Sequence, residues 1–178
     1  MPNIADDDAD GNKPLSQDRR KYFYPTFVFV KWMQARFGGK LIYDVGSGME
    51  HVGKALAKAG MLVTAIGLAP RDQSEFPVLQ ADSTIYPFER DALMMLCRPC
   101  HDDRFVRKTV LRALSSGART VIYVGLQRNV RQDLGAHYKQ FTKRRIRNIG
   151  HADEEVWEMS VSRLQANANL RRGTIPPL

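Results

Sequence analysis

The stretch Leu41-Ile42-Tyr43-Asp44-Val45-Gly46-Ser47-Gly48 decides the fold, because an apolar run leads directly into a glycine turn. A helical pattern rich in glycine and alanine, Met49 to Ala59, follows without a break. This order predicts a buried strand, a tight turn and a helix, and a Cβ in the turn would block both the turn and the close approach of a ligand. The crossing places backbone N–H groups and the positive end of a helix dipole at the end of the strand. The stretch therefore indicates a pocket for a nucleotide-like ligand.

The residues around this stretch predict strands that alternate with helices. Tyr22 to Phe37 is interpreted as a helix that begins near Pro25, although Phe27 to Val30 also suits a strand. Strands are predicted at 40–44, 61–66, 76–80, 91–97, 120–124 and 156–161, and further helices at 103–116 and 130–149, the last one broken at Gly135. The link between the second and third strands is too short for a full helix. The pattern predicts an α/β fold: a doubly wound, mostly parallel sheet with helices on both faces and one trimmed edge.

Length and composition predict a single folded domain. The chain has 178 residues, of which 43% are hydrophobic and 26% are charged, as is usual for a folded protein. Residues 1–18 hold five acids and one base without apolar periodicity, and are expected to be a disordered acidic leader. Residues 165–178 are expected to be a flexible tail, which leaves 19–164 as the domain. An acidic N-terminus and the lack of a long apolar run predict a cytoplasmic location and no membrane partner.

The two cysteines, Cys97 and Cys100, are three positions apart. The spacing would suit a redox dithiol or half of a zinc site, but a zinc site needs two more ligands and only His101 is close in sequence. We therefore expect no metal, with one thiol packed in a strand and the other in the loop that follows.

Positive charge is concentrated in the second half of the chain. Between Arg104 and Ile149 there are twelve bases and one acid, Asp133, whereas the whole chain has a net charge of +8. Phosphate-bearing partners, either nucleic acid or a phosphorylated small molecule, fit this balance. The alternative is that the bases form the solvated faces of two helices.

The order of these motifs resembles the class I S-adenosylmethionine-dependent methyltransferases, over roughly Leu41 to Leu126. In that family the first strand ends in an acid and a glycine turn that hold the methionine part of the cofactor, and an acid after the third strand contacts the adenine. The resemblance implies a Rossmann-like methyltransferase fold and S-adenosylmethionine as the cofactor. It implies a cofactor site formed by Asp44, Gly46, Ser47, Gly48, Leu68, Asp82 and Ser83.

Two positions depart from the family pattern. The third glycine of the turn is replaced by Glu50, and the acid that usually holds the ribose hydroxyls is replaced by Gly67. A bidentate carboxylate contributes on the order of 2 to 3 kcal/mol to such binding. Asp72 lies five residues further on and would substitute if the loop folds back. A nicotinamide cofactor fits less well, because His51 stands at the third glycine of that motif and the acid is missing there too.

The segment Cys97-Arg98-Pro99 after the fourth predicted strand resembles an Arg-Pro-Pro segment in a small group of methyltransferase-like archaeal proteins. Methyl transfer depends on alignment more than on a dedicated base. Arg98 is a candidate for binding an anionic substrate and His101 for accepting a proton. Alternatively, Arg98 pairs with Asp102 or Asp103 to fix the loop.

Two functions follow from these observations. The first is a methyltransferase that acts on an acidic substrate such as nucleic acid. The second is a non-catalytic protein of the same fold that serves as a basic nucleic-acid-binding or assembly module. In both hypotheses the anion is bound by Lys139, Lys143, Arg144, Arg145 and Arg147, of which four are expected on the polar side of the helix predicted at 130–149.

Overall fold

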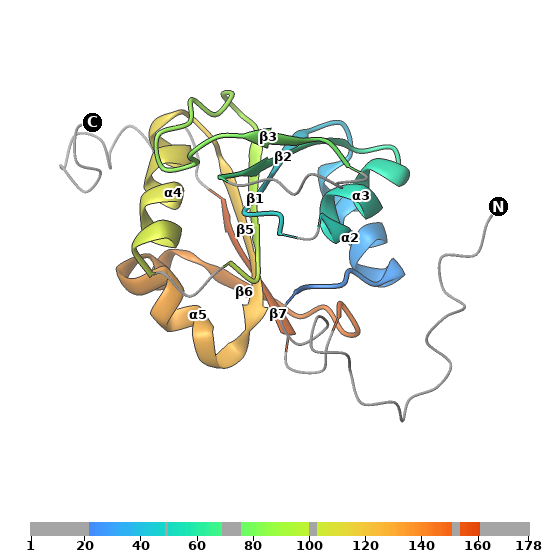
Figure 1. Ribbon diagram of the computed structural model, residues 1–178. Coiled ribbons are helices and arrows are strands. Elements are labelled where there is room, and N and C mark those ends of the chain that lie inside the picture. The colour runs from blue at the N-terminus through green and yellow to red at the C-terminus, as the bar shows by residue number, and fades with distance from the viewer. Residues whose placement is uncertain (1–21, 49, 69–75, 100–102, 151–153, 161–178) are drawn as a thin grey trace.

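The computed structural model describes residues 22–48, 50–68, 76–99, 103–150 and 154–160 (Figure 1). The predicted leader and tail lie outside these ranges. The helices are α2 (Phe27–Phe37), α3 (His51–Lys58), α4 (Asp103–Ser115), α5 (Gln127–Leu134) and the 3-10 helix η1 (Gly135–Gln140). The strands are β1 (Leu41–Val45), β2 (Leu62–Gly67), β3 (Val78–Gln80), β4 (Leu93–Cys97), β5 (Thr120–Leu126), β6 (Thr142–Arg144) and β7 (Glu154–Ser160).

The strands form one seven-stranded sheet in the order β3-β2-β1-β4-β5-β7-β6. The first five strands in this order are parallel, whereas β7 runs antiparallel to both β5 and β6. Tyr43 at the centre of β1 pairs with Thr64 on one side and Met94 on the other. The predicted doubly wound, mostly parallel sheet in a single domain is confirmed. Because the strand order reverses between β1 and β4, the fold leaves a crevice at their carboxyl ends.

Helices cover both faces of the sheet, as predicted (Figure 1). Alternate residues of each strand point to opposite faces, so Tyr43 and Val45 lie in the core on the side of α4 and α5. Ile42 lies in a second core that includes Phe29 of α2 and Leu56 of α3. The connection between β3 and β4, residues 81–92, contains no helix. None of the described helices has the length and apolar character needed to span a membrane.

The sequence predicted that the first helix begins near Pro25, and α2 begins two residues later, at Phe27. Thr26 caps it by accepting a hydrogen bond from the Phe29 amide at 3.4 Å, and the Thr26 amide donates to the Ile149 carbonyl at 3.0 Å. The helix prediction is therefore right for Phe27 to Phe37, but Tyr22 to Thr26 form an extended segment.

The helix predicted over 130–149 breaks at Gly135 as predicted, because α5 ends there and the 3-10 helix η1 follows. The prediction is wrong beyond Gln140, because Thr142–Arg144 form the edge strand β6. Lys143 lies opposite Trp157 in the pairing of β6 with β7. Pairing with a neighbouring strand satisfies these backbone groups, so the tertiary contact overrides the helical periodicity.

Candidate functional site

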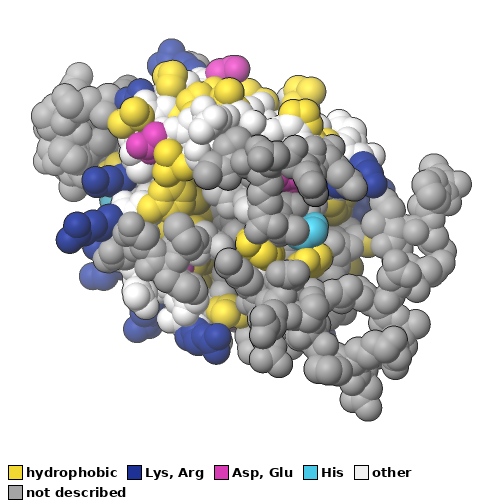
Figure 2. Space-filling model, viewed as in Figure 1, with side chains coloured by type: hydrophobic (Ala, Val, Ile, Leu, Met, Phe, Trp, Pro, Cys, Tyr) yellow, Lys and Arg dark blue, Asp and Glu magenta, His cyan; other side chains and the backbone are white. Residues whose placement is uncertain are grey.

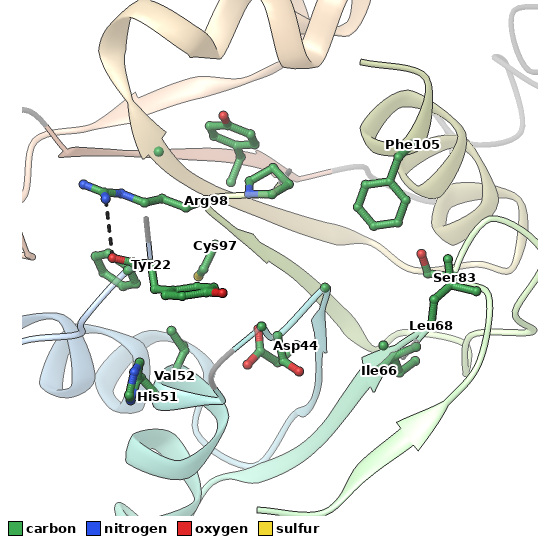
Figure 3. A pocket seen from close by; sticks show the side chains of 18 of the residues that line it. Tyr22, Asp44, His51, Val52, Ile66, Leu68, Ser83, Cys97, Arg98 and Phe105 are labelled. Atoms are coloured by element: carbon green, nitrogen blue, oxygen red, sulfur yellow. Dashed lines mark hydrogen bonds between the residues drawn. The ribbon is translucent and has the colours of Figure 1, made fainter. Parts of the chain in front are cut away.

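A cavity of about 660 Å³ opens at the carboxyl ends of the parallel strands (Figure 3). The ends of β1, β2, β4 and β5 and the first turns of α3, α4 and α5 contribute to its wall. The predicted site residues that line it are Asp44, Gly46, Ser47, Gly48, Leu68, Ser83 and Arg98. The sequence therefore located this cavity, although it did not show which of these side chains bind a ligand.

The glycine turn has the backbone that the sequence required. Gly46 and Gly48 both have positive φ, +67° and +57°. The Gly46 amide donates to the Ile66 carbonyl at 2.8 Å, which fixes the end of β1 against β2. A Cβ on Gly48 would lie 2.9 Å from Cε1 of Tyr22, so the turn needs glycine both for its conformation and for close packing.

Asp44 is a strongly perturbed acid in the cavity. Its side chain is 1% exposed, and its Oδ2 accepts a hydrogen bond from the Gly53 amide of α3 at 3.0 Å. Its Oδ1 is buried and accepts no hydrogen bond within the described residues. Burial raises the pKa of Asp44 to about 7; the Gly53 amide lowers it, and the charge of Glu50 raises it further. A buried carboxylate oxygen without a partner is costly, so this atom is suited to accept a donor from a ligand.

Glu50, at the position of the missing third glycine, has the backbone conformation that glycine favours. Its φ is +61° and it forms the N-cap position of α3. Its amide donates to the Ser47 carbonyl at 2.8 Å, and its carbonyl accepts from the Lys54 amide at 2.9 Å. The departure from the family pattern therefore changes the side chain but leaves the turn intact.

The residues after β3 have different surroundings. Ser83 is buried at the cavity, and its hydroxyl shares a hydrogen bond of 2.9 Å with Thr109 of α4. Asp82 does not line the cavity. Its Oδ1 accepts hydrogen bonds from the hydroxyl and the amide of Thr84 at 2.7 and 2.8 Å. These two bonds lower the pKa of Asp82. An adenine contact by Asp82 stays a prediction.

The ribose side of the predicted site is formed by the end of β2. Gly67 is the last residue of that strand and lines the cavity, where a Cβ would lie 3.4 Å from Val78. Asp72, the predicted substitute acid, lies outside the described residues. The consequence of the missing carboxylate stays a prediction.

Arg98 follows β4 in the left-handed conformation, with φ of +44°. Its Nε lies 2.6 Å from Oε1 of Glu154 at the start of β7, and the two side chains are 8% and 0% exposed. Its Nη1 also donates to the Tyr22 carbonyl at 3.4 Å (Figure 3). The sequence did not indicate the distant Glu154 as a partner. Asp102 and the side chain of Asp103 lie outside what the structure describes, so pairing of Arg98 with either of them stays a prediction. His101 lies outside the described residues.

Sequence reasoning missed several residues of the cavity wall. Tyr22 reaches it from the extended segment before α2, and neighbouring Tyr24 stacks on His51 with ring centroids 4.1 Å apart. Tyr123 of β5 lines it, and its hydroxyl donates a hydrogen bond to the buried Asp133. Phe105 and Asn129 reach it from α4 and α5. No local sequence motif marks these residues. The only signal in the sequence was the predicted position of the strand ends, near which the cavity lies.

The five predicted anion-binding residues lie away from the cavity wall. Lys143 forms an ion pair with Glu155, and Arg144 lies 2.7 Å from Glu158. Lys139, Arg145 and Arg147 are exposed.

Cys97, the last residue of β4, lines the cavity as a free thiol. Burial raises its pKa well above the usual value, and nearby Asp44 and Glu154 add to the rise. Cys100 lies outside the described residues. Among the described residues, no group of three His, Cys, Asp or Glu side chains is placed to hold a metal ion.

Comparison with solved structures identifies the fold. No family model matches the chain, and no curated protein matches its sequence. Magnesium protoporphyrin IX methyltransferase from Synechocystis PCC 6803 aligns with 75% of this chain and 76% of its own, at 16% identity and a TM-score of 0.52. The 23S rRNA methyltransferase ErmE aligns with 85% of this chain and 75% of its own, at 13% identity and a TM-score of 0.54. The 1,6-didemethyltoxoflavin-N1-methyltransferase of Burkholderia thailandensis aligns with 75% of this chain and 76% of its own, at 12% identity and a TM-score of 0.53. The chain thus has the fold of the class I S-adenosylmethionine-dependent methyltransferases.

Proposed function

We propose that this chain is a cytoplasmic S-adenosylmethionine-dependent methyltransferase, with residues 19–164 as its folded unit, and that it acts on an acidic substrate, nucleic acid. The observation that carries the proposal is Oδ1 of Asp44. This atom is buried beside the glycine turn and accepts no hydrogen bond within the described residues. A carboxylate in that state is suited to a positively charged donor, which the methionine part of the cofactor has.

The residues present fit the cofactor. Asp44 and the turn from Gly46 to Gly48 would hold its methionine part, and the wall near Leu68 and Ser83 would hold its adenosine part. When bound, S-adenosylmethionine would supply an electrophilic methyl group to a lone pair of the acceptor, with the carbon–sulfur electron pair leaving on sulfur and any N–H or O–H proton of the acceptor passing to solvent.

The chain's own residues fix the opposite wall. Arg98 is held between Glu154 and the Tyr22 carbonyl, which places Pro99 and the end of β4 at the cavity. Tyr123 is fixed by its hydrogen bond to Asp133. Burial and that bond together raise the pKa of its phenol well above the usual value. Its phenol therefore stays protonated near neutral pH and acts as a hydrogen-bond donor to Asp133. These contacts orient an acceptor and exclude water, which is most of what methyl transfer requires.

The test is calorimetric titration with S-adenosylmethionine and S-adenosylhomocysteine. We expect micromolar binding that weakens at least tenfold in Asp44→Asn. The matched control is Asp91→Asn, which removes a half-exposed acid far from the glycine turn, at the opposite ends of the strands, and leaves an asparagine that tolerates the positive φ of +64° there. Equal affinity in Asp44→Asn and the control, or no binding at millimolar ligand, would contradict the proposal.

A second function is favoured by Gly67. With no carboxylate at the end of β2, a protein of this fold would serve as a non-catalytic basic module that binds nucleic acid or helps assembly. Nucleic acid binding by a protein that binds neither cofactor form at millimolar concentration would support this second function.

A further inference from the structure

The charges around the cavity limit what can enter it. Among the described residues that line it, Arg98 is the only lysine or arginine, and its charge is compensated by the buried Glu154 at 2.6 Å. Asp44 adds a carboxylate to the same cavity. An anionic group that entered would lose its hydration without gaining an uncompensated cation, which is costly. The group that receives the methyl is therefore uncharged.

Several aromatic side chains line the cavity. Figure 3 shows Tyr22 and Phe105 on opposite sides of the cavity, with Arg98 on the side of Tyr22. Tyr123 and Pro99 complete the wall. Flat apolar surfaces of this kind favour a planar group, because bases stack on aromatic rings.

The outer rim of the cavity is basic. Phe105 and Asn129 line the cavity from the first turns of α4 and α5, and the residues directly before them, Arg104 and Arg128, are exposed. One turn further along the same helices, Lys108 and Arg131 are exposed as well. Lysine and arginine side chains gather on the side of the molecule where α4 and α5 lie (Figures 1 and 2).

Few acids lie near this rim in the sequence, and two of them, Asp102 and Asp103, directly precede Arg104. From Arg104 to Leu134 the chain contains one acid, Asp133, which is buried and accepts a hydrogen bond from the hydroxyl of Tyr123. Hydrogen bonds from Thr84 lower the pKa of Asp82, and the charge of Lys108 adds to this lowering. In the segment Lys139 to Arg147, two of the five cations are paired with Glu155 and Glu158.

We propose that the rim formed by Lys108, Arg128 and Arg131 binds the phosphates of a single-stranded nucleic acid, and that one uncharged base of that strand enters the cavity. The inference deepens the proposed function and rests on it for the role of the base. Phosphate contacts position a strand without reading its sequence, and a base must leave its stack to reach a cavity of this kind.

The test uses two variants with the same change in charge. The rim variant is Lys108→Gln/Arg128→Gln/Arg131→Gln, and the control is Lys139→Gln/Arg145→Gln/Arg147→Gln. Each removes one lysine and two arginines, all of them exposed. The probe is a fluorescein-labelled 20-nucleotide RNA of mixed sequence, measured by anisotropy between 50 and 200 mM salt.

We expect the rim variant to lose at least tenfold in affinity and its log–log salt slope to fall by about 2, since each phosphate contact on a single strand contributes about 0.7. The control should lose less than threefold. Equal losses in both variants, or a larger loss in the control, would overturn the assignment to the rim. A strand of 20 abasic DNA sites should bind more weakly than base-bearing DNA, and equal affinity would remove the base from the cavity.

Titration with S-adenosylmethionine separates this inference from the proposed function. Both triple variants should keep the wild-type cofactor affinity. Cofactor binding without RNA binding would overturn the inference and leave the proposed function standing. RNA binding through the rim without cofactor binding would support the rim and overturn the proposed function.

Discussion

Arg98 and Glu154 are joined by a buried ion pair, with Nε of Arg98 2.6 Å from Oε1 of Glu154. The pair connects the end of β4 to the start of β7, two strands separated in the sheet by β5. Tyr22 is added to the same cluster through its carbonyl, so three distant parts of the chain meet at the cavity.

Breaking this pair should destabilise the protein strongly. Arg98→Met leaves Glu154 buried without its charged partner, and removal of one partner from a buried pair costs about 3 to 5 kcal/mol. Arg98→Met/Glu154→Met removes both charges and should recover most of that loss. Urea unfolding of the wild type, both single variants and the double variant measures the coupling. A double variant as unstable as the sum of the single variants would show that the two side chains do not interact.

Gly48→Ala should cost more than Gly60→Ala. Both glycines have left-handed backbones, with φ of +57° and +79°, so alanine is strained by about 1 kcal/mol or more at either site. A Cβ at Gly60 meets nothing within 4 Å, whereas one at Gly48 would displace the Tyr22 ring. We expect Gly48→Ala to unfold at lower urea concentration and, under the proposed function, to bind S-adenosylmethionine at least tenfold more weakly. Identical behaviour of the two variants would show that the contact with Tyr22 is unimportant.

Asp44 should make the protein less stable as pH rises from 4 to 7. Burial raises its pKa from the ordinary 3.8 to about 7, so in this range the folded protein binds a proton that the unfolded chain has lost. Each pKa unit corresponds to about 1.4 kcal/mol, and Asp44→Asn should remove this part of the pH dependence. Urea unfolding at several pH values gives the difference between wild type and variant. Parallel curves for the wild type and Asp44→Asn would contradict the prediction.

The same titration should affect ligand binding in the opposite direction. If the ionised carboxylate of Asp44 accepts the cofactor's charged donor, affinity for S-adenosylmethionine should increase as pH rises through about 7. Titration of the wild type from pH 6 to 8 checks this, and a flat profile would indicate that Asp44 is already ionised or is not a ligand.

The sequence predicted the parts of the fold that depend on local pattern. The strand before the glycine turn, the helix after it and the buried strands β4 and β5 were found within about two residues, since apolar runs and glycines act over a few positions. The same patterns located the cavity, because the carboxyl ends of neighbouring parallel strands must meet at one edge of the sheet.

The errors of the prediction arise from long-range contacts. Thr142 to Arg144 carry no strand pattern of their own, and they form a strand only because β7 pairs with them. Glu154 could not be assigned to Arg98, because the antiparallel return of β7 beside β5 brings them together. Tyr22 was not assigned to the cavity, because the contact of Thr26 with the distant Ile149 holds its segment there.

Variants of Glu50 test what the left-handed backbone costs at the position where the family pattern has its third glycine. Its φ of +61° costs an ordinary residue roughly 1 to 2 kcal/mol relative to a right-handed conformation, whereas glycine accepts it readily. Glu50→Gly and Glu50→Ala both remove the carboxylate, so the difference between them isolates the backbone. We expect Glu50→Gly to be more stable than Glu50→Ala by about 1 kcal/mol in urea unfolding. Both variants should lower the pKa of Asp44, because the charge of Glu50 contributes to raising it. Equal stability of the two variants would mean that the turn relaxes out of the left-handed conformation when the side chain is removed.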